Sequence, residues 1–357
     1  MPSSARVTRL RTRLLQWYGE NARDLPWRRT SDAYAIWISE AMLQQTQVGT
    51  VVDYYLRFLQ AFPDVKSLAE ASEEEVLALW SGLGYYRRAR SLQAAARVIV
   101  AEHSGRFPRE GAAALRLPGV GRYTAGAVLS IAYGLPQALV DGNVERVFSR
   151  FFGLDGVAGS RDLVSHCWDL AQHLVPRSGA GDWNQALMEL GALVCTPRQA
   201  ACGDCPLGRS CQARKEGRVE ELPRAKARAA VEALEVELLV IRRGARMLLE
   251  QRPRDHALGG LWQLPTRTVG GARTRAMSLF SREWAGGLEV REEPDLGWVR
   301  HSITRLSIRA RLRPGKASGR RGNGFAWFKA EELGPLGLTG MTRKALARLN
   351  DWPAGPD

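Results

Sequence analysis

The sequence has few lysines and no long apolar run. Only six of its 51 basic residues are lysines, and none lies between Lys66 and Lys215. The longest apolar runs, at 125–132 and 238–241, are far shorter than the roughly 20 residues that cross a bilayer, which excludes an integral membrane protein. The first twenty residues carry arginines but no long apolar segment and no small-residue cleavage site, so we expect a cytoplasmic protein without a membrane partner.

Length and charge indicate two domains and a polyanionic partner. A chain of 357 residues suits two domains, and 45% hydrophobic with 25% charged residues is typical of globular proteins rather than of disordered or collagen-like chains. The net charge of +14 favours a polyanion, because Lys and Arg release counterions from phosphates. Residues 1–222 hold 26 basic and 23 acidic residues, against 25 and 14 in 223–357, so a phosphate-binding surface in the first part must be local.

The pattern of apolar residues changes along the chain. Residues 1–215 show helical spacing, as in Tyr34–Leu43 and Ala89–Val100, and predict an all-α domain. The polar segment 216–230 is interpreted as a linker. Residues 231–350 predict an α+β domain, with strands and helices expected at Glu235–Ile241, Arg246–Glu250, Leu306–Leu312, Gly324–Phe328, 272–284 and 340–349.

Four of the five cysteines lie close together. Cys195, Cys202, Cys205 and Cys211 have the spacing C-x6-C-x2-C-x5-C, whereas Cys167 lies apart and is expected to be a buried packing residue. In a reducing compartment, four thiolates within 17 residues indicate a metal centre rather than disulfides. The spacing leaves zinc and a [4Fe–4S] cluster open, because four cysteines suit both but zinc ribbons usually have two C-x2-C pairs.

Residues 117–127 predict a tight turn that runs into a helix. Gly119 and Gly121 let the backbone turn sharply and leave amide groups free at the helix N-terminus, where a phosphate oxygen can bind. A generic helix-turn-helix loop would also explain these glycines. Asp141 follows in the segment Val-Asp-Gly-Asn-Val.

A second carboxylate lies upstream. Glu40 is predicted on a helix rich in Trp, Met and Leu, and apolar surroundings raise the pKa of a carboxyl group and keep it protonated as a general acid. Asp141 would be its ionised partner. One protonated and one ionised carboxyl group can divide acid catalysis and charge stabilisation between them. A single Glu on a helix is more often solvated or part of a cap, so the pairing is a hypothesis.

These motifs together resemble the A/G-specific adenine DNA glycosylase (MutY) family of the endonuclease III-like helix-hairpin-helix superfamily. The resemblance covers roughly residues 8–215 and lies in L-P-W-R (25–28), W-x-S-E-x-M-L-Q-Q-T-Q-V (37–48), L-W-x-G-L-G-Y-Y-x-R-A-R (79–90), L-P-G-V-G-R-Y-T-A (117–125), D-G-N-V-x-R-V (141–147) and N-Q-A-L-M-E-L-G-A-L-V-C (184–195). It implies a helix-hairpin-helix domain with a [4Fe–4S] loop at 195–211, followed by a Nudix-like α+β domain. It also implies a nucleoid-associated monomer that acts on A:8-oxoguanine or A:G mispairs in double-stranded DNA.

The resemblance implies catalytic roles. Glu40 would protonate adenine at N7 and later guide water, Asp141 would stabilise the cationic sugar, and Tyr123 and Asn143 would line the same site. Superfamily members that also cut the strand use a lysine where this chain has Tyr123, so we expect a hydrolase that leaves an intact abasic site.

The resemblance also implies binding residues. The flipped adenine would be received by Trp27, Arg28 and Glu189, with Glu189 reading its amino edge. Because an extruded base leaves a gap in the stack, large side chains would fill it, namely Gln45, Leu83 and Tyr85. The DNA backbone would be contacted by Gly119, Gly121 and Arg198, and the cluster would be held by Cys195, Cys202, Cys205 and Cys211.

The second domain departs from two patterns. Residues 258–265 resemble the opening of a Nudix fold, but the magnesium-binding acidic set is missing and Arg273–Glu283 holds one acidic residue, so pyrophosphate hydrolysis is not expected. In the family, a Phe-Ser-His loop recognises 8-oxoguanine, whereas this chain has Ile303, Thr304 and Arg305. Thr304 retains a hydroxyl group that can hydrogen-bond the oxidised base.

Two alternative functions would require other residues than those of this sequence or fewer of them. An endonuclease III-like glycosylase and lyase would require a lysine at position 123, where this chain has tyrosine. A non-catalytic DNA-binding module would need neither Glu40 nor Asp141.

Overall fold

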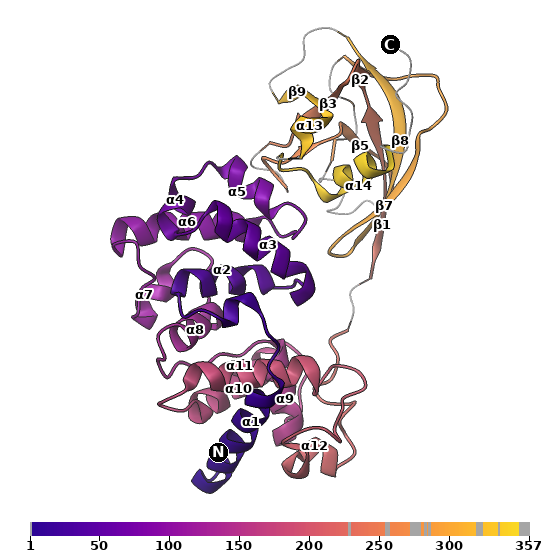
Figure 1. The fold of residues 1–357 in the computed structure, drawn as a ribbon. Helices are drawn as coiled ribbons and strands as arrows, with labels where there is room; N and C mark the ends of the chain where they lie inside the picture. Colours follow the sequence, from indigo (N-terminus) through magenta and orange to yellow (C-terminus); the bar gives the residue numbers. More distant parts are fainter. Residues whose placement is uncertain are drawn as a thin grey trace. The chain divides into compact units, whose positions relative to one another are not determined.

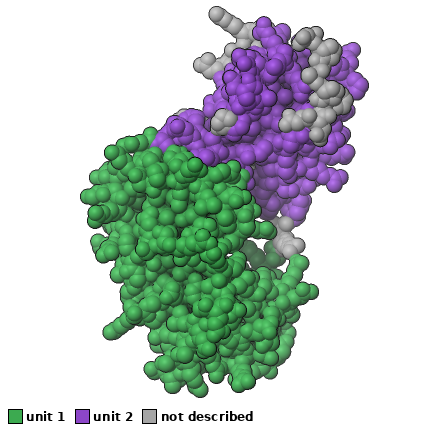
Figure 2. Space-filling model, viewed as in Figure 1, with its two compact units in different colours: residues 1–70, 91–227 green, residues 71–90, 228–357 purple. Residues whose placement is uncertain are grey.

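The computed structural model describes residues 2–227, 230–253, 258–271, 280–281, 284, 287–318, 324–334 and 336–349. The chain divides into two compact units, which Figure 2 shows in different colours. Unit 1 comprises Met1–Glu70 and Ser91–Ala227, and unit 2 comprises Ala71–Arg90 and Arg228–Asp357. Residues 71–90 thus group with the C-terminal part of the chain, although the sequence suggested one helical domain over 1–215. The boundaries at 216 and 230 stay a prediction.

Helices build the whole of unit 1, as predicted (Figure 1). The predicted helices at Tyr34–Leu43 and Ala89–Val100 correspond to α2 and to part of α6, which begins in unit 2. The helices are α1 (Ser4–Asn21), η1 (Pro26–Arg28), α2 (Ala33–Leu43), α3 (Val48–Ala61), α4 (Val65–Glu70), α6 (Arg87–Glu102), α7 (Gly111–Arg116), α8 (Arg122–Ile131), α9 (Gly142–Phe152), α10 (Arg161–Leu174), α11 (Ala180–Leu193), η2 (Gly208–Ser210) and α12 (Gln212–Lys215).

Two helices that carry site residues have aspartate caps. Asp32 accepts hydrogen bonds from the amides of Tyr34 and Ala35 at the start of α2, and Asp141 accepts one from the amide of Val144 at the start of α9. Such caps satisfy amides that have no partner inside the helix. α2 is buried on every side, and α9 ends at Gly153, whose positive φ of 70° favours glycine.

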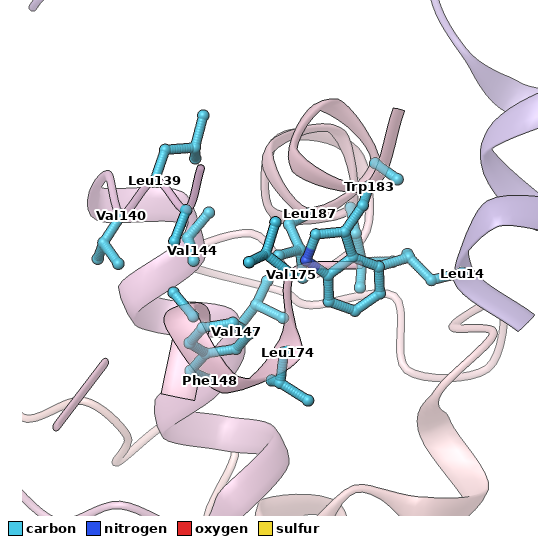
Figure 3. Packing of buried hydrophobic residues seen from close by; sticks show 14 of the residues in the cluster. Leu14, Leu139, Val140, Val144, Val147, Phe148, Leu174, Val175, Trp183 and Leu187 are labelled. Atoms are coloured by element: carbon cyan, nitrogen blue, oxygen red, sulfur yellow. The ribbon is translucent and has the colours of Figure 1, made fainter. Parts of the chain in front are cut away.

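One apolar core joins α1, α9, α10 and α11. Figure 3 shows Leu14, Phe148, Leu174 and Trp183 in this cluster, and all four side chains are at most 1% exposed. Cys167 is fully buried in the same core, which confirms its predicted packing role. Burying each large apolar side chain contributes about 1.5–3 kcal/mol to folding, so this core fixes α9 and α11 relative to each other.

Unit 2 contains two sheets and three helices among its described residues. One sheet has the order β5-β1-β8-β6 with β7 also paired to β8, and the other has the order β2-β3-β4 with β9 paired to β3. β1 runs parallel to β8 and antiparallel to β5. The elements are α5 (Glu73–Trp80), β1 (Glu232–Val240), β2 (Arg242–Arg243), β3 (Arg246–Gln251), β4 (Trp262–Gln263), β5 (Thr266–Gly271), β6 (Leu288–Val290), β7 (Gly297–Ile303), β8 (Leu306–Ala317), β9 (Phe325–Lys329), α13 (Ala330–Leu333) and α14 (Gly340–Leu349).

The predicted strands correspond to β1, β3, β8 and β9, and the predicted helix at 340–349 corresponds to α14. Alternate residues of β8, such as Ile308 and Leu312, share a core with Met341 and Ala345 of α14. The predicted helix at 272–284 falls largely on 272–279, 282 and 283, which lie outside the described residues. The described helices include none that combines the length and apolar character needed to cross a membrane.

The first half of the expected linker is attached to unit 1. The amide of Arg224 donates to the carbonyl of Gly156 (2.9 Å), and the amide of Ala158 donates to the carbonyl of Arg224 (2.8 Å). Leu222 is 1% exposed. These contacts anchor residues up to 224.

Candidate active site

The structure brings most of the predicted catalytic and substrate-binding residues around one cavity of unit 1, with a volume of about 500 Å³. The described residues that line it include no lysine. Those predicted from sequence are Trp27, Arg28, Glu40, Gln45, Tyr123, Asp141, Asn143 and Glu189. Leu83, Tyr85 and Thr304 belong to unit 2.

Glu40 lies on α2 and is 4% exposed. The hydroxyl of Tyr123, on α8, donates a 2.5 Å hydrogen bond to Glu40 Oε2 and lies 3.4 Å from Met188 Sδ. Burial raises the pKa of Glu40 to about 7, the hydrogen bond from Tyr123 opposes this rise, and the nearby charge of Asp141 adds to it. Glu40 is therefore set to hold a proton near neutral pH, as a general acid must.

Asp141 precedes α9 and is held by two hydrogen bonds. Its Oδ1 accepts from the amide of Val144 (2.7 Å), and its Oδ2 accepts from Asn143 Nδ2 (2.8 Å). Burial raises the pKa of Asp141 above its ordinary value, but the hydrogen bonds from Val144 and Asn143 oppose the rise. These donors, together with the N-terminus of α9, favour the charged form. The two carboxyl groups thus have different surroundings.

Two arginines of α9 connect the site to the cysteine loop. Arg146 donates to Asn143 Oδ1 (2.8 Å) and to the carbonyl of Cys195 (2.7 Å). Arg150 is 3% exposed and donates to the carbonyl of Thr196 (2.7 Å), with its guanidinium 3.5 Å from Cys195 Sγ. The loop that begins at Cys195 is therefore tied to the helix that Asp141 caps.

Glu189, on α11, is 1% exposed and bound by two arginines. Arg23 donates its backbone amide, Nε and one terminal nitrogen to this carboxylate, and Arg28 donates two terminal nitrogens, at 2.7–3.0 Å. Burial alone would raise the pKa of Glu189, but the bonds from Arg23 and Arg28 outweigh it and lower the pKa to about 2. Five donors fill the roughly four acceptor positions of a carboxylate.

Sequence reasoning missed Arg23 and Met188. Arg23 stands 166 positions from Glu189 along the chain, and no local pattern indicates that pairing. The charge of Arg23, two residues before the L-P-W-R motif, is the one available signal. Met188 precedes Glu189 on α11, within the 184–195 motif, in which only Glu189 and Cys195 were predicted to be functional.

The glycine turn has the predicted conformation. Gly119 has φ +76°, and a Cβ placed on it would lie 2.6 Å from Ser91 Cβ, so both the backbone and the space require glycine. Gly121 precedes α8 with φ −94° and has open space around it. Its surroundings leave room for a ligand at the start of α8.

The four cysteines of the 195–211 loop line one small cavity of about 20 Å³, together with Arg150 and Arg214. Burial raises the pKa of Cys205 to about 11, and the three other thiols add to the rise. The described residues contain no group of three or more His, Cys, Asp or Glu side chains placed to hold a metal ion. Four thiols on one cavity nevertheless have the donor chemistry that a [4Fe–4S] cluster requires. Arg198, in the same loop, is exposed.

The remaining predicted residues lie in turns of unit 2. Leu83 is 6% exposed, whereas Tyr85 is 48% exposed and has a positive φ of 48°. Thr304 lies between β7 and β8 with φ +50°, and its hydroxyl donates to the carbonyl of Ile303 (2.7 Å). Tyr85 and Thr304 are accessible side chains on strained backbone, as recognition loops often are.

Two parts of the chain match known protein families. Residues 38–173 match the HhH-GPD superfamily of base excision DNA repair proteins, and residues 237–348 match the NUDIX domain. A solved thermostable thymine-DNA glycosylase is 32% identical, with a TM-score of 0.54 over 59% of this chain and 97% of that one. The chain thus has the fold of a base excision repair DNA glycosylase.

Two curated relatives narrow this class to one family. Adenine DNA glycosylase of Rattus norvegicus is 39% identical and is matched over 85% of this chain and 70% of its own length. Adenine DNA glycosylase of Homo sapiens is 38% identical, over 85% of this chain and 66% of its own length. The chain belongs to the adenine DNA glycosylase family, which confirms the predicted family.

Proposed function

We propose that the protein hydrolyses the N-glycosidic bond of adenine paired with 8-oxoguanine or guanine in duplex DNA, without cutting the strand, and that it works at the nucleoid. The observation that carries this proposal is the pairing of Glu40 and Asp141 around one cavity that Tyr123 completes. The chain has no lysine between Lys66 and Lys215 to attack the sugar, which favours water over an amine nucleophile.

The proposed reaction assigns one task to each carboxyl group. Protonated Glu40 donates its proton to adenine N7, the C1′–N9 bond breaks, and its electron pair leaves with adenine. Ionised Asp141 stabilises the oxocarbenium-like sugar, and Asn143 holds Asp141 in place through the 2.8 Å hydrogen bond. Water then attacks C1′ and returns a proton to Glu40. Tyr123 keeps the Glu40 carboxyl group oriented.

The adenine pocket is proposed to consist of Trp27, Arg28 and Glu189. Trp27 packs edge-on against Tyr55, with ring centroids 5.4 Å apart, which fixes the indole as a wall. Five N–H groups already occupy the acceptor positions of the Glu189 carboxylate. For this carboxylate to accept a hydrogen bond from the amino group of adenine, one of the two arginines must first release it. Arg28 lines the cavity and can turn its guanidinium to the base.

DNA is proposed to contact both units. Gln45, Leu83 and Tyr85 would fill the stack around the extruded base, and Thr304 would hydrogen-bond 8-oxoguanine. Backbone phosphates would bind the turn at Gly119 and Gly121, which has open space at Gly121, and the exposed Arg198. Amides at a helix N-terminus and guanidinium groups both bind phosphate oxygens.

A [4Fe–4S] cluster is proposed to be held by Cys195, Cys202, Cys205 and Cys211, where it would fix the loop that carries Arg198. The support is the single cavity that the four thiols line. Iron and acid-labile sulfide should be found in the purified protein, with broad absorption in the visible range. A colourless protein with a full complement of zinc would contradict the cluster.

Single-turnover release of adenine tests the proposed function. Adenine should be released from duplexes in which it lies opposite 8-oxoguanine or guanine, and much more slowly where it lies opposite cytosine or thymine. Borohydride should trap little covalent adduct, because no amine forms a Schiff base with the sugar. Release of a damaged pyrimidine with efficient trapping would instead support the lyase alternative.

A further inference from the structure

Unit 1 has a second cavity, of about 230 Å³, which we call the basic cavity. Arg6, Arg9 and Arg13 of α1 form one side, and Lys215 of α12 forms another. Its described lining residues include four cationic side chains and no carboxylate. Such a concentration of one charge around a concave surface creates a strong positive potential.

The arginines of the basic cavity occupy electrostatically unfavourable positions on α1. Arg6, Arg9 and Arg13 are spaced three and four residues apart and therefore share one face of α1, where like charges repel each other. Arg6 also lies in the first turn, where the helix dipole disfavours a cation and where α1 has no acidic residue. Leu10 and Leu14 bury the adjacent face in the core and hold this face in place. An anionic ligand would remove the repulsion.

Among the described residues, no carboxylate compensates these charges. The Arg6 guanidinium stacks over the rings of Phe151 and Phe152, at 5.4 and 5.5 Å from their centroids. Arg9, Arg13 and Lys215 are exposed, and no carboxylate of the described residues forms an ion pair with them. A nearby carboxylate, Glu216, accepts a hydrogen bond from Gln212 (2.5 Å) and is paired with Arg218 (3.5 Å).

The basic cavity is separate from the proposed active site. Asp141 caps the first turn of α9, whereas Phe151 lines the basic cavity from its last turn. At 1.5 Å per residue the two ends of this helix are roughly 15 Å apart. The described linings of the two cavities share no residue. A ligand in the basic cavity would therefore not occupy the adenine pocket.

We propose that the basic cavity is a second phosphate-binding site and that it takes phosphate groups of a DNA backbone beyond the nucleotide held at the active site. Its volume lies below the roughly 300 Å³ at which pockets for drug-sized ligands begin, which suits one or two phosphates rather than a whole nucleotide. Guanidinium groups bind phosphate through paired N–H donors. The inference goes beyond the proposed glycosylase function and does not depend on which base is removed.

The test is the salt dependence of binding to an undamaged duplex, measured on the full chain with its cofactor. Each phosphate contact contributes about 0.9 to the slope of log K against log salt. The double variant R9Q/R13Q should reduce the magnitude of that slope by about 1 to 2 and weaken binding at low salt, and K215Q should act in the same direction. The control R161Q/R177Q removes two exposed arginines outside the cavity and should keep the slope of the unsubstituted protein. Since no base is excised in this assay, it is independent of whether the proposed function holds.

Thermal unfolding with tripolyphosphate distinguishes a DNA backbone from a free oligophosphate. R9Q/R13Q without ligand should unfold at or above the temperature of the unsubstituted protein, because the substitutions relieve repulsion. Tripolyphosphate should raise the unfolding temperature of the unsubstituted protein more than that of R9Q/R13Q. An unchanged salt slope would overturn the proposal, and if tripolyphosphate still protected only the unsubstituted protein, the ligand would be a free oligophosphate instead of DNA.

Discussion

The hydroxyl of Tyr123 donates a 2.5 Å hydrogen bond to Glu40 Oε2 across 83 positions of sequence. The bond joins α8, the helix that follows the glycine turn, to α2, which is buried on every side. Burial pushes the pKa of Glu40 up, and the hydrogen bond from Tyr123 holds it at about 7. The balance leaves Glu40 able both to give and to accept a proton near neutral pH, which a group that first protonates adenine and then guides water must do.

Replacing Tyr123 with phenylalanine should shift the pH dependence of excision. The hydroxyl lowers the pKa of Glu40, so Tyr123→Phe raises it. Because excision needs protonated Glu40, the rate falls as pH rises through that pKa, and in the variant this fall should come at higher pH. Single-turnover rates between pH 5 and 9 measure it. Tyr133→Phe is the matched control, since the Tyr133 hydroxyl bonds the carbonyl of Phe107 instead. A shift to lower pH in Tyr123→Phe would refute the assignment.

Glu40→Gln should stabilise the fold at alkaline pH. The pKa of Glu40 is about 7 in the folded protein against an ordinary 4.5, so the folded state binds the proton more tightly. The free energy of unfolding therefore decreases as pH rises from about 4.5 to about 7, by roughly 3 kcal/mol in total. Glutamine removes this loss. In urea unfolding, the free energy of unfolding of Glu40→Gln should exceed that of the unsubstituted protein by more at pH 8 than at pH 5. Glu102→Gln, at an exposed site, should show no such difference.

Alanine at the two glycines of the turn should have different effects. Gly119→Ala places a Cβ 2.6 Å from Ser91 Cβ at φ +76°, which should cost about 1–3 kcal/mol of unfolding free energy and weaken DNA binding. Gly121→Ala meets nothing within 4 Å at φ −94° and should leave stability nearly unchanged. Thermal unfolding of both variants measures the contrast. Equal losses would mean that the left-handed turn at Gly119 does not support this part of the fold.

Local patterns in the sequence were enough to predict the parts of the site but not how they are joined. Helix spacing and turn chemistry indicated Glu40 and the glycine turn, and the family resemblance indicated Asp141. The bonds from Arg23 to Glu189 and from Arg146 to Cys195 join residues 166 and 49 positions apart, and they form because α1, α9 and α11 pack on one core. No periodicity encodes such pairings.

Local sequence patterns also could not predict how the chain divides into two units. Residues 71–90 have the helical spacing of the first domain, yet they group with residues 228–357. The polar composition of 216–224 predicted a linker, but backbone hydrogen bonds of Arg224 to Gly156 and Ala158 attach this segment to unit 1. The composition of a segment shows how polar it is, but not which backbone groups form hydrogen bonds with it.

Single-turnover release of adenine by Glu40→Gln and Asp141→Asn tests the central claim most directly. Both substitutions keep the shape of the side chain but remove the proton donor in one case and the negative charge in the other. On a duplex with adenine opposite 8-oxoguanine, each should lower the excision rate by a factor of about 100 to 10,000 or more, while affinity for the duplex stays within a few-fold of the unsubstituted protein. Excision at close to the original rate by either variant would contradict the account.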